Sequence, residues 1–172
     1  MVISTSKKVL ILVEQDFQDM EAMYPYYRLK EAGFDVKVAG SDAKVYNGKH
    51  GYPIEADGKI EEFKAEDFAA VIIPGGWAPD YMRRNKVMID FVKEMNEKGK
   101  VVAAICHAAS LLVSADVLKG KKMTCFVAVK DDAINAGADF VDEEVVVDKN
   151  LITSRTPDDL PAFCREIIKA LE

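Results

Sequence analysis

The chain has 172 residues, enough for a single core, and we expect one domain over residues 1–172. Apolar residues make up 49% and charged residues 30%, which excludes a disordered, collagen-like or coiled-coil protein. The net charge of −6 disfavours nucleic acid as a partner. No apolar run reaches the roughly 18–20 residues of a membrane span, and the N-terminal residues do not resemble a signal peptide. We therefore expect a cytoplasmic protein with neither a nucleic-acid nor a membrane partner.

The first half of the chain alternates apolar runs with amphipathic stretches. Continuous or alternating apolar residues predict strands over 8–13, 35–39 and 70–73. Between the first two, a helix is predicted over 17–32, with an apolar face formed by Phe17, Met20, Met23, Tyr24 and Tyr27. Turn signals over 43–62, among them two Asn-Gly or Asp-Gly pairs, predict a small hairpin.

The second half continues the alternation. The predicted elements are a helix capped by Asn85, a buried strand over 101–105, a helix over 108–114, a strand over 123–126, a helix over 130–136, a hairpin of 145–147 with 151–153, and a last helix from Pro157. This order of strands and helices implies right-handed crossovers and a mostly parallel sheet with helices on both faces.

Ligands of an open parallel sheet bind beyond the carboxyl ends of its strands, and three of the predicted ends carry unusual residues. Carboxylates, among them Glu21, follow the first strand. Pro74-Gly75-Gly76 follows the third and leads to Asp80. Cys106-His107 follows the fourth. The predicted fold therefore brings a thiol, an imidazole, carboxylates and a diglycine turn to one rim.

Cys106 is the strongest candidate for a reactive residue. A strand that runs directly into a helix, with a nucleophile at the corner, is the layout of a nucleophile elbow. The amides that follow Cys106 favour a thiolate and a lowered pKa, and they can hold an oxyanion. The alternative is a buried cysteine that merely ends a strand, beside a helix-capping His107.

The other candidates carry weaker signals. Gly75-Gly76 lacks the Lys and Ser or Thr of a phosphate loop, so it is an oxyanion hole or only a turn. No phosphate-binding loop follows any strand, and we expect no cofactor and no metal. His50 is expected in a surface turn, and Cys125 and Cys164 in the core. Three widely spaced cysteines fit neither a disulfide framework nor a zinc site.

Taken together, several short segments resemble one known family. They are Asp19-Met20-Glu21, Tyr24-Pro25-Tyr26, Gly48-Lys49-His50-Gly51-Tyr52, Pro74-Gly75-Gly76, Ala104-Ile105-Cys106-His107 and Ser154-Arg155. From Lys8 to Leu171 the chain is similar to the ThiJ/PfpI family, the PfpI-type intracellular proteases of the class I glutamine amidotransferase-like superfamily. The resemblance implies a flavodoxin-like three-layer α/β/α sandwich with a nucleophile elbow.

The resemblance also implies roles for individual residues. Cys106 would be the nucleophile, with His107 as its neighbour and Glu21 holding a proton beside the thiol. The amides of Gly75, Gly76 and His107 would form the oxyanion site. Asp80 stands where relatives place a glutamate that reaches the histidine of another subunit, and its shorter side chain reduces that reach.

Phe126 stands where relatives with glyoxalase or amidase-like activity carry a histidine or tyrosine, so one polar partner is missing. Sites completed across an interface imply a homo-oligomer, a dimer or a hexamer. The leading hypothesis is a cysteine hydrolase that acts on a small molecule, a peptide or amide, or a damaged, glycated protein. The alternatives are a redox-sensing or chaperone-like stress protein and a glyoxalase-type enzyme acting on methylglyoxal.

Overall fold

A seven-stranded sheet forms the centre of the structure, a computed structural model that describes residues 6–172. Its strands are β1 (Lys8–Leu12), β2 (Asp35–Gly40), β5 (Gly58–Lys59), β6 (Ala70–Ile73), β7 (Val101–Ile105), β10 (Val145–Asp148) and β11 (Leu151–Ser154). They lie in the order β10-β11-β7-β6-β1-β2-β5, and every neighbouring pair is parallel except β10 with β11. The predicted mostly parallel sheet is confirmed.

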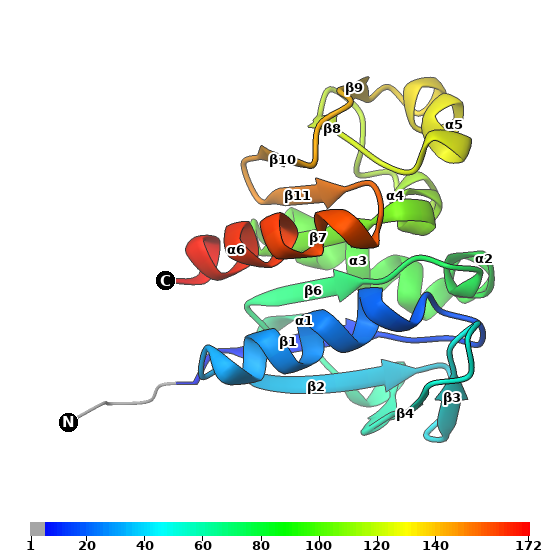
Figure 1. The fold of residues 1–172 in the computed structure, drawn as a ribbon, viewed down its shortest axis with the longest axis vertical. Coiled ribbons are helices and arrows are strands. Elements are labelled where there is room, and N and C mark those ends of the chain that lie inside the picture. Colours follow the sequence, from blue (N-terminus) through cyan, green and yellow to red (C-terminus); the bar gives the residue numbers. More distant parts are fainter. Residues whose placement is uncertain (1–5) are drawn as a thin grey trace.

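Helices cover both faces of this sheet. They are α1 (Asp19–Glu31), α2 (Ala78–Met82), α3 (Lys86–Glu97), α4 (Ala109–Ser114), α5 (Lys130–Asn135) and α6 (Leu160–Leu171). Helices α1 and α6 pack together on one face, and α3 and α4 on the other (Figure 1). As predicted, Asn85 caps α3, because its side chain accepts hydrogen bonds from the first free amides of that helix. The short helix α2 was not predicted.

The face that α1 turns to the core differs in part from the prediction, since Met23 and Tyr24 pack against the core as predicted. The side chains of Met20 and Tyr27 are 50% and 57% exposed, and Phe17 lies before the helix, which begins at Asp19. The buried face instead carries Ala22, Leu29 and the carboxyl group of Glu21. A spacing of apolar residues does not say which side of a helix faces the core. A charged residue on that side is a departure from the usual pattern and points to function.

The strand predicted over 123–126 is mostly absent. Only β8 (Lys122–Met123) forms, and it pairs with β9 (Asp139–Phe140) outside the main sheet. Beyond β8 the chain leaves the ladder: the Thr124 amide donates to the Thr153 hydroxyl at 2.9 Å, and the Phe126 amide donates to the Cys106 carbonyl at 3.2 Å. Cys125 is therefore buried as predicted, but it lies outside a strand.

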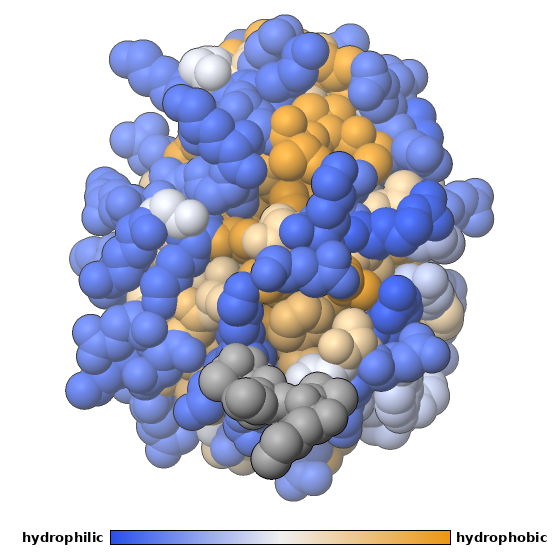
Figure 2. Space-filling model, turned by 90° about the vertical axis from the view of Figure 1, so that its left-hand side faces the viewer, coloured by the Kyte–Doolittle hydropathy of each residue, from blue (hydrophilic) through white to orange (hydrophobic). Residues whose placement is uncertain are grey.

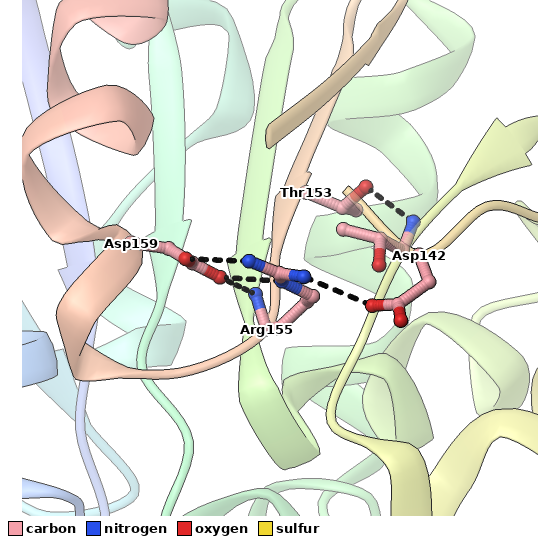
Figure 3. Close-up of polar contacts among 5 residues, drawn as sticks. Asp142, Thr153, Arg155 and Asp159 are labelled. Atoms are coloured by element: carbon pink, nitrogen blue, oxygen red, sulfur yellow. Dashed lines mark hydrogen bonds and ion pairs between the residues drawn. The ribbon is translucent and has the colours of Figure 1, made fainter. Parts of the chain in front are cut away.

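The loop after β11 is fixed by one arginine, as Figure 3 shows. Arg155 donates to both carboxylate oxygens of Asp159 at the start of α6, and to Asp142 at 2.9 Å. These two carboxylates raise the pKa of the guanidinium further. The Ser154-Arg155 motif therefore connects the end of β11 to α6, whose buried stripe includes Phe163, Cys164 and Ile167.

All the parallel strands end at one edge of the sheet, the right-hand edge in Figure 1. The hairpin of β3 (Val45–Asn47) and β4 (Pro53–Glu55) and the helix α2 lie at this edge. The opposite side of the molecule, where the strands begin, presents mainly hydrophilic residues with apolar atoms between them (Figure 2). Across residues 6–172, no helix is both long enough and apolar enough to cross a bilayer.

Candidate active site

Cys106 stands at the sharp corner between β7 and α4. Its φ of +62° is in the left-handed region, which costs a non-glycine residue about 1–3 kcal/mol and is found mainly at functional sites. A single 3-10 turn over 106–108 leads from the strand into the helix. Cys106 is 8% exposed, whereas Cys125 and Cys164 are 2% and 1% exposed. The local geometry is that of the predicted elbow.

The imidazole of His107 contacts the thiol directly. Nδ1 of His107 lies 3.3 Å from Sγ of Cys106, although side chains of consecutive residues normally diverge. The ring stacks on Phe126 at a centroid distance of 4.9 Å and lies against Trp77 at 5.8 Å. Burial, and then the positive charge of Lys49, lower the pKa of His107. The ring is thus neutral at pH 7, and Nδ1 can accept a proton when the ring hydrogen is on Nε2.

Glu21 brings a buried carboxyl group to the same corner. Its side chain is fully buried, and Oε2 accepts a 2.7 Å hydrogen bond from the Gly75 amide. Within the described part of the chain, Oε1 has no nitrogen or oxygen partner. Burial raises the pKa of Glu21 to about 7, against the lowering effects of the Gly75 amide, the Cys106 thiol and the charge of Lys49. At neutral pH the protonated and the ionised forms of Glu21 are therefore both present in quantity.

The expected low pKa of Cys106 is contradicted. Burial raises it to about 12, and the negative charge of Glu21 adds to this effect. The amides of His107 and Gly76 act in the opposite direction, as expected at an elbow, but they do not prevail. The thiol is therefore protonated at pH 7, and a base beside it is needed to form the thiolate.

The three amides expected to form the oxyanion site have different roles. The Gly75 amide is already bonded to Glu21, which leaves the amides of Gly76 and His107 facing the sulfur. Neither glycine has room for a side chain. A Cβ on Gly75 would lie 2.6 Å from Glu21 Oε2, and one on Gly76, whose φ is +75°, would lie 2.4 Å from the Gln18 nitrogen.

Asp80 lies on α2 at the outer rim of the site. It lines a cavity of about 470 Å³ together with Trp77 and His107 of the same chain. Its exposed carboxylate forms an ion pair with Arg84. In residues 6–172 no carboxylate is hydrogen-bonded to the His107 ring. Asp80 is thus beside His107 without contacting it.

The remaining sequence candidates are outside the site. His50 is exposed in the turn before β4, and the pKa values of Cys125 and Cys164 are raised to about 12 by burial. Among the described residues, no group of three or more His, Cys, Asp or Glu side chains is arranged to hold a metal ion. The residue that sequence reasoning missed is Lys49, whose charge acts on both Glu21 and His107. Its signal was the Gly48–Tyr52 motif, which predicts a turn but not what the turn packs against.

The sheet order, the covering helices and the cysteine at a strained strand-to-helix corner define a flavodoxin-like α/β protein with a nucleophile elbow. The profile of the DJ-1/PfpI family matches residues 7–170, and the chain belongs to this family.

Similar proteins cover nearly the whole chain. Deglycase PfpI of Pyrococcus furiosus is 44% identical, over 96% of this chain and 99% of its own. Protein/nucleic acid deglycase 2 of Escherichia coli is 43% identical, over 96% and 98%. A two-domain protein of Anabaena variabilis with DJ-1/ThiJ/PfpI-like and ferritin-like domains has a crystal structure with a TM-score of 0.95 and 50% identity. The match covers 96% of this chain and 48% of that one.

Proposed function

We propose that the protein is a cysteine-dependent hydrolase that attacks the carbonyl group of peptides, amides or glycated protein adducts. The observation that carries this proposal is the 3.3 Å contact between Cys106 Sγ and His107 Nδ1, beside two free amides. A thiol with a pKa near 12 becomes a nucleophile at pH 7 only if a neighbouring base takes its proton, and the neutral His107 meets that need.

The proposed reaction has two halves. Nδ1 of His107 accepts the thiol proton while sulfur bonds to the carbonyl carbon, and the amides of Gly76 and His107 hold the oxyanion. His107 then returns the proton to the leaving amine, and a thioester remains on Cys106. In the second half the imidazole takes a proton from water, the hydroxide attacks the thioester carbon, the C–S bond breaks as the imidazolium returns the proton to the sulfur, and the acid product leaves.

Glu21 supports this reaction in its protonated form. A charged carboxylate beside Cys106 repels a thiolate, whereas a protonated one can donate its hydrogen to the sulfur. Because its pKa is about 7, the protonated form is present in quantity at neutral pH. The names of the two deglycases support a substrate of the glycated-adduct type. Attack of the Cys106 sulfur on a carbonyl carbon is the step common to all three substrate types, and the two halves described above apply to a peptide or amide.

Turnover of an unbiased panel tests this function. Peptides, amides and methylglyoxal adducts of amino acids are incubated with wild type, Cys106→Ala and Cys125→Ala in parallel. We expect turnover by wild type and Cys125→Ala, and none by Cys106→Ala. Activity that survives in Cys106→Ala overturns the proposal. A blank across the whole panel favours instead a redox-sensing or chaperone-like protein, or, if methylglyoxal itself is consumed, a glyoxalase.

We further propose that the chain acts as a homo-oligomer with the site near an interface. Trp77 is 61% exposed at the site rim, beside exposed Tyr81 and the carboxylate of Asp80. Large apolar side chains grouped at the surface are typical of contacts between subunits. A second subunit at this rim would close the cavity beside His107 and bring a further carboxylate within reach of it.

A further inference from the structure

The turn over 48–52, between β3 and β4, is firmly held although it is exposed. The carboxylate of Asp19, itself buried, accepts hydrogen bonds from the amides of His50 and Tyr52 at 2.9 Å each. Gly48 packs directly against the same carboxylate, since a Cβ at this position would lie 2.3 Å from Asp19 Oδ1. An ordinary surface turn has no such internal anchor, so the position of this turn is fixed relative to α1.

The same turn is bonded to the segment that carries the Gly76 amide. The Lys49 amide donates to the Phe17 carbonyl at 2.9 Å, and Phe17 in turn pairs with Gly76 in an isolated β-bridge. Two neighbouring backbone contacts of about 4.8 Å each put the Lys49 backbone roughly 10 Å from that of Gly76. The flexible four-carbon stem of a lysine covers much of that distance.

The charge of Lys49 acts on the site from this position. Its positive charge lowers the pKa of the buried Glu21 and of the half-buried His107. The backbone of Lys49 is one hydrogen bond from Phe17, which pairs with Gly76, so the turn places this residue at the rim of the site. Lys49 is exposed, and among residues 6–172 no carboxylate forms an ion pair with it.

We propose that Lys49 is the anion-binding residue of the Cys106 site, and that it selects substrates with a carboxylate or similar anionic group beside the attacked carbonyl. The reacting position at Cys106 is taken from the proposed function. Among residues 6–172 Lys49 has no acidic partner, so an anionic group on the ligand would form an ion pair that the described part of the protein does not already make. The fixed turn positions this charge in advance of binding.

Alkylation of Cys106 by two small reagents tests the inference. Iodoacetate carries a carboxylate and iodoacetamide is its neutral analogue, so the ratio of their rates reports the local potential and is independent of the thiolate fraction. We expect Lys49→Met to lower the iodoacetate-to-iodoacetamide ratio about fivefold to tenfold at low salt, as expected for opposite charges several ångströms apart. Lys49→Arg should keep the ratio, and high salt should reduce it in the wild type.

Lys44→Met is the matched control, because Lys44 is in the same β-hairpin region but packs over the Tyr46 ring at 5.0 Å. Its ratio should equal that of the wild type. An unchanged ratio in Lys49→Met overturns the inference, as does an equal fall with both reagents, which would show an effect on the thiol alone. If Cys106 reacts with neither reagent, calorimetry with phenylacetate and phenylacetamide decides the question. Preference for the anion, lost in Lys49→Met, supports it, and equal or absent binding overturns it.

These experiments can contradict the proposed hydrolase activity or the proposed anion site without contradicting the other. Alkylation needs only an accessible Cys106 and no turnover. A substrate panel without turnover, together with a ratio that depends on Lys49, removes the hydrolase and keeps the anion site. Turnover by wild type with a ratio that does not depend on Lys49 does the reverse.

Discussion

Sγ of Cys106 lies 3.3 Å from Nδ1 of His107, the next residue in the chain. The left-handed φ of +62° at Cys106 makes this possible, because it turns toward each other two side chains that would otherwise diverge. The ring is then held by Phe126 on one side, with Trp77 near it. A cysteine–histidine pair is thus built from adjacent residues by backbone strain and aromatic packing.

His107→Ala removes the base from this pair. We expect a loss of turnover of at least about 100-fold, in line with the contribution of a general base. Alkylation of Cys106 near pH 8 should also slow, since no imidazole accepts the thiol proton. His50→Ala, at the exposed turn, is the control and should match the wild type. Turnover by His107→Ala within about tenfold of wild type would mean that another group deprotonates Cys106.

The sequence predicts those elements whose burial requires a regular pattern of apolar residues. Strands β1 and β7 are covered on both faces, so their residues are apolar without interruption and easily recognised. The face of α1 was predicted only in part, because Met20 and Tyr27 are exposed while Glu21, an ionisable residue, is on the buried side. The strand near residue 123 was predicted too long because its continuation bonds to Thr153 and Cys106, which are distant in sequence.

In the candidate site, too, local features follow from the sequence and effects of distant residues do not. Cys106 and His107 follow from the motif at the corner, and the positive φ is a local property. The raised pKa of Cys106 is not local, because it arises from burial and from a carboxyl group 85 positions away along the chain, at residue 21. An argument from the helix start alone includes the favourable amides and omits these larger opposing effects.

Glu21→Gln should change how stability depends on pH. The folded-state pKa of Glu21, about 7, is above its usual value of 4.5, so the folded protein holds a proton that the unfolded chain releases. The stabilisation is complete below pH 4.5 and is lost as the pH rises to about 7. At about 1.4 kcal/mol per pH unit, the loss is about 3 kcal/mol.

Urea denaturation at pH 4.5, 6 and 8 measures this effect. The free energy of unfolding of Glu21→Gln, relative to wild type, should rise across this range by an amount of that order. Glu97→Gln, at the exposed end of α3, is the control and should leave the difference flat. Parallel curves for wild type and Glu21→Gln would show that Glu21 is ionised in the folded protein throughout.

Gly75→Ala should separate damage at the site from loss of stability. The new methyl group would meet both Glu21 Oε2 at 2.6 Å and Cys106 Cβ at 2.8 Å, so the two functional side chains must move. We expect turnover and Cys106 alkylation to fall at least tenfold. Gly33→Ala, at a φ of +93° with open space around it, should cost about 1 kcal/mol of stability and leave both rates unchanged. Equal rates in the two variants would show that the site tolerates the added methyl group.

Light scattering tests the proposed assembly. We expect a mass of at least two chains at micromolar concentration, since the rim around Trp77 and Tyr81 exposes apolar surface. Trp77→Glu should shift the mass toward one chain, because it places a charge in that contact. A single monomer peak for the wild type across the micromolar range would remove any contribution of Asp80 from another subunit.

Asp80→Glu and Asp80→Ala test whether the carboxylate on α2 takes part in catalysis. An aspartate side chain ends about 1.5 Å, one carbon–carbon bond, short of a glutamate. In the structure Asp80 pairs with Arg84 rather than with His107, so we expect Asp80→Ala to change turnover by less than about twofold. Asp80→Glu should raise turnover, because the longer side chain extends toward an imidazole that needs an acceptor within about 2.6–3.2 Å. Asp90→Ala is the matched control, since Asp90 forms an exposed pair of the same i,i+4 type with Lys86 on α3 and should have no effect. A loss of turnover in Asp80→Ala as large as that in His107→Ala would contradict this prediction. It would show that the aspartate already orients the ring in the assembled protein. If neither Asp80 variant changes turnover, the carboxylate on α2 has no catalytic role.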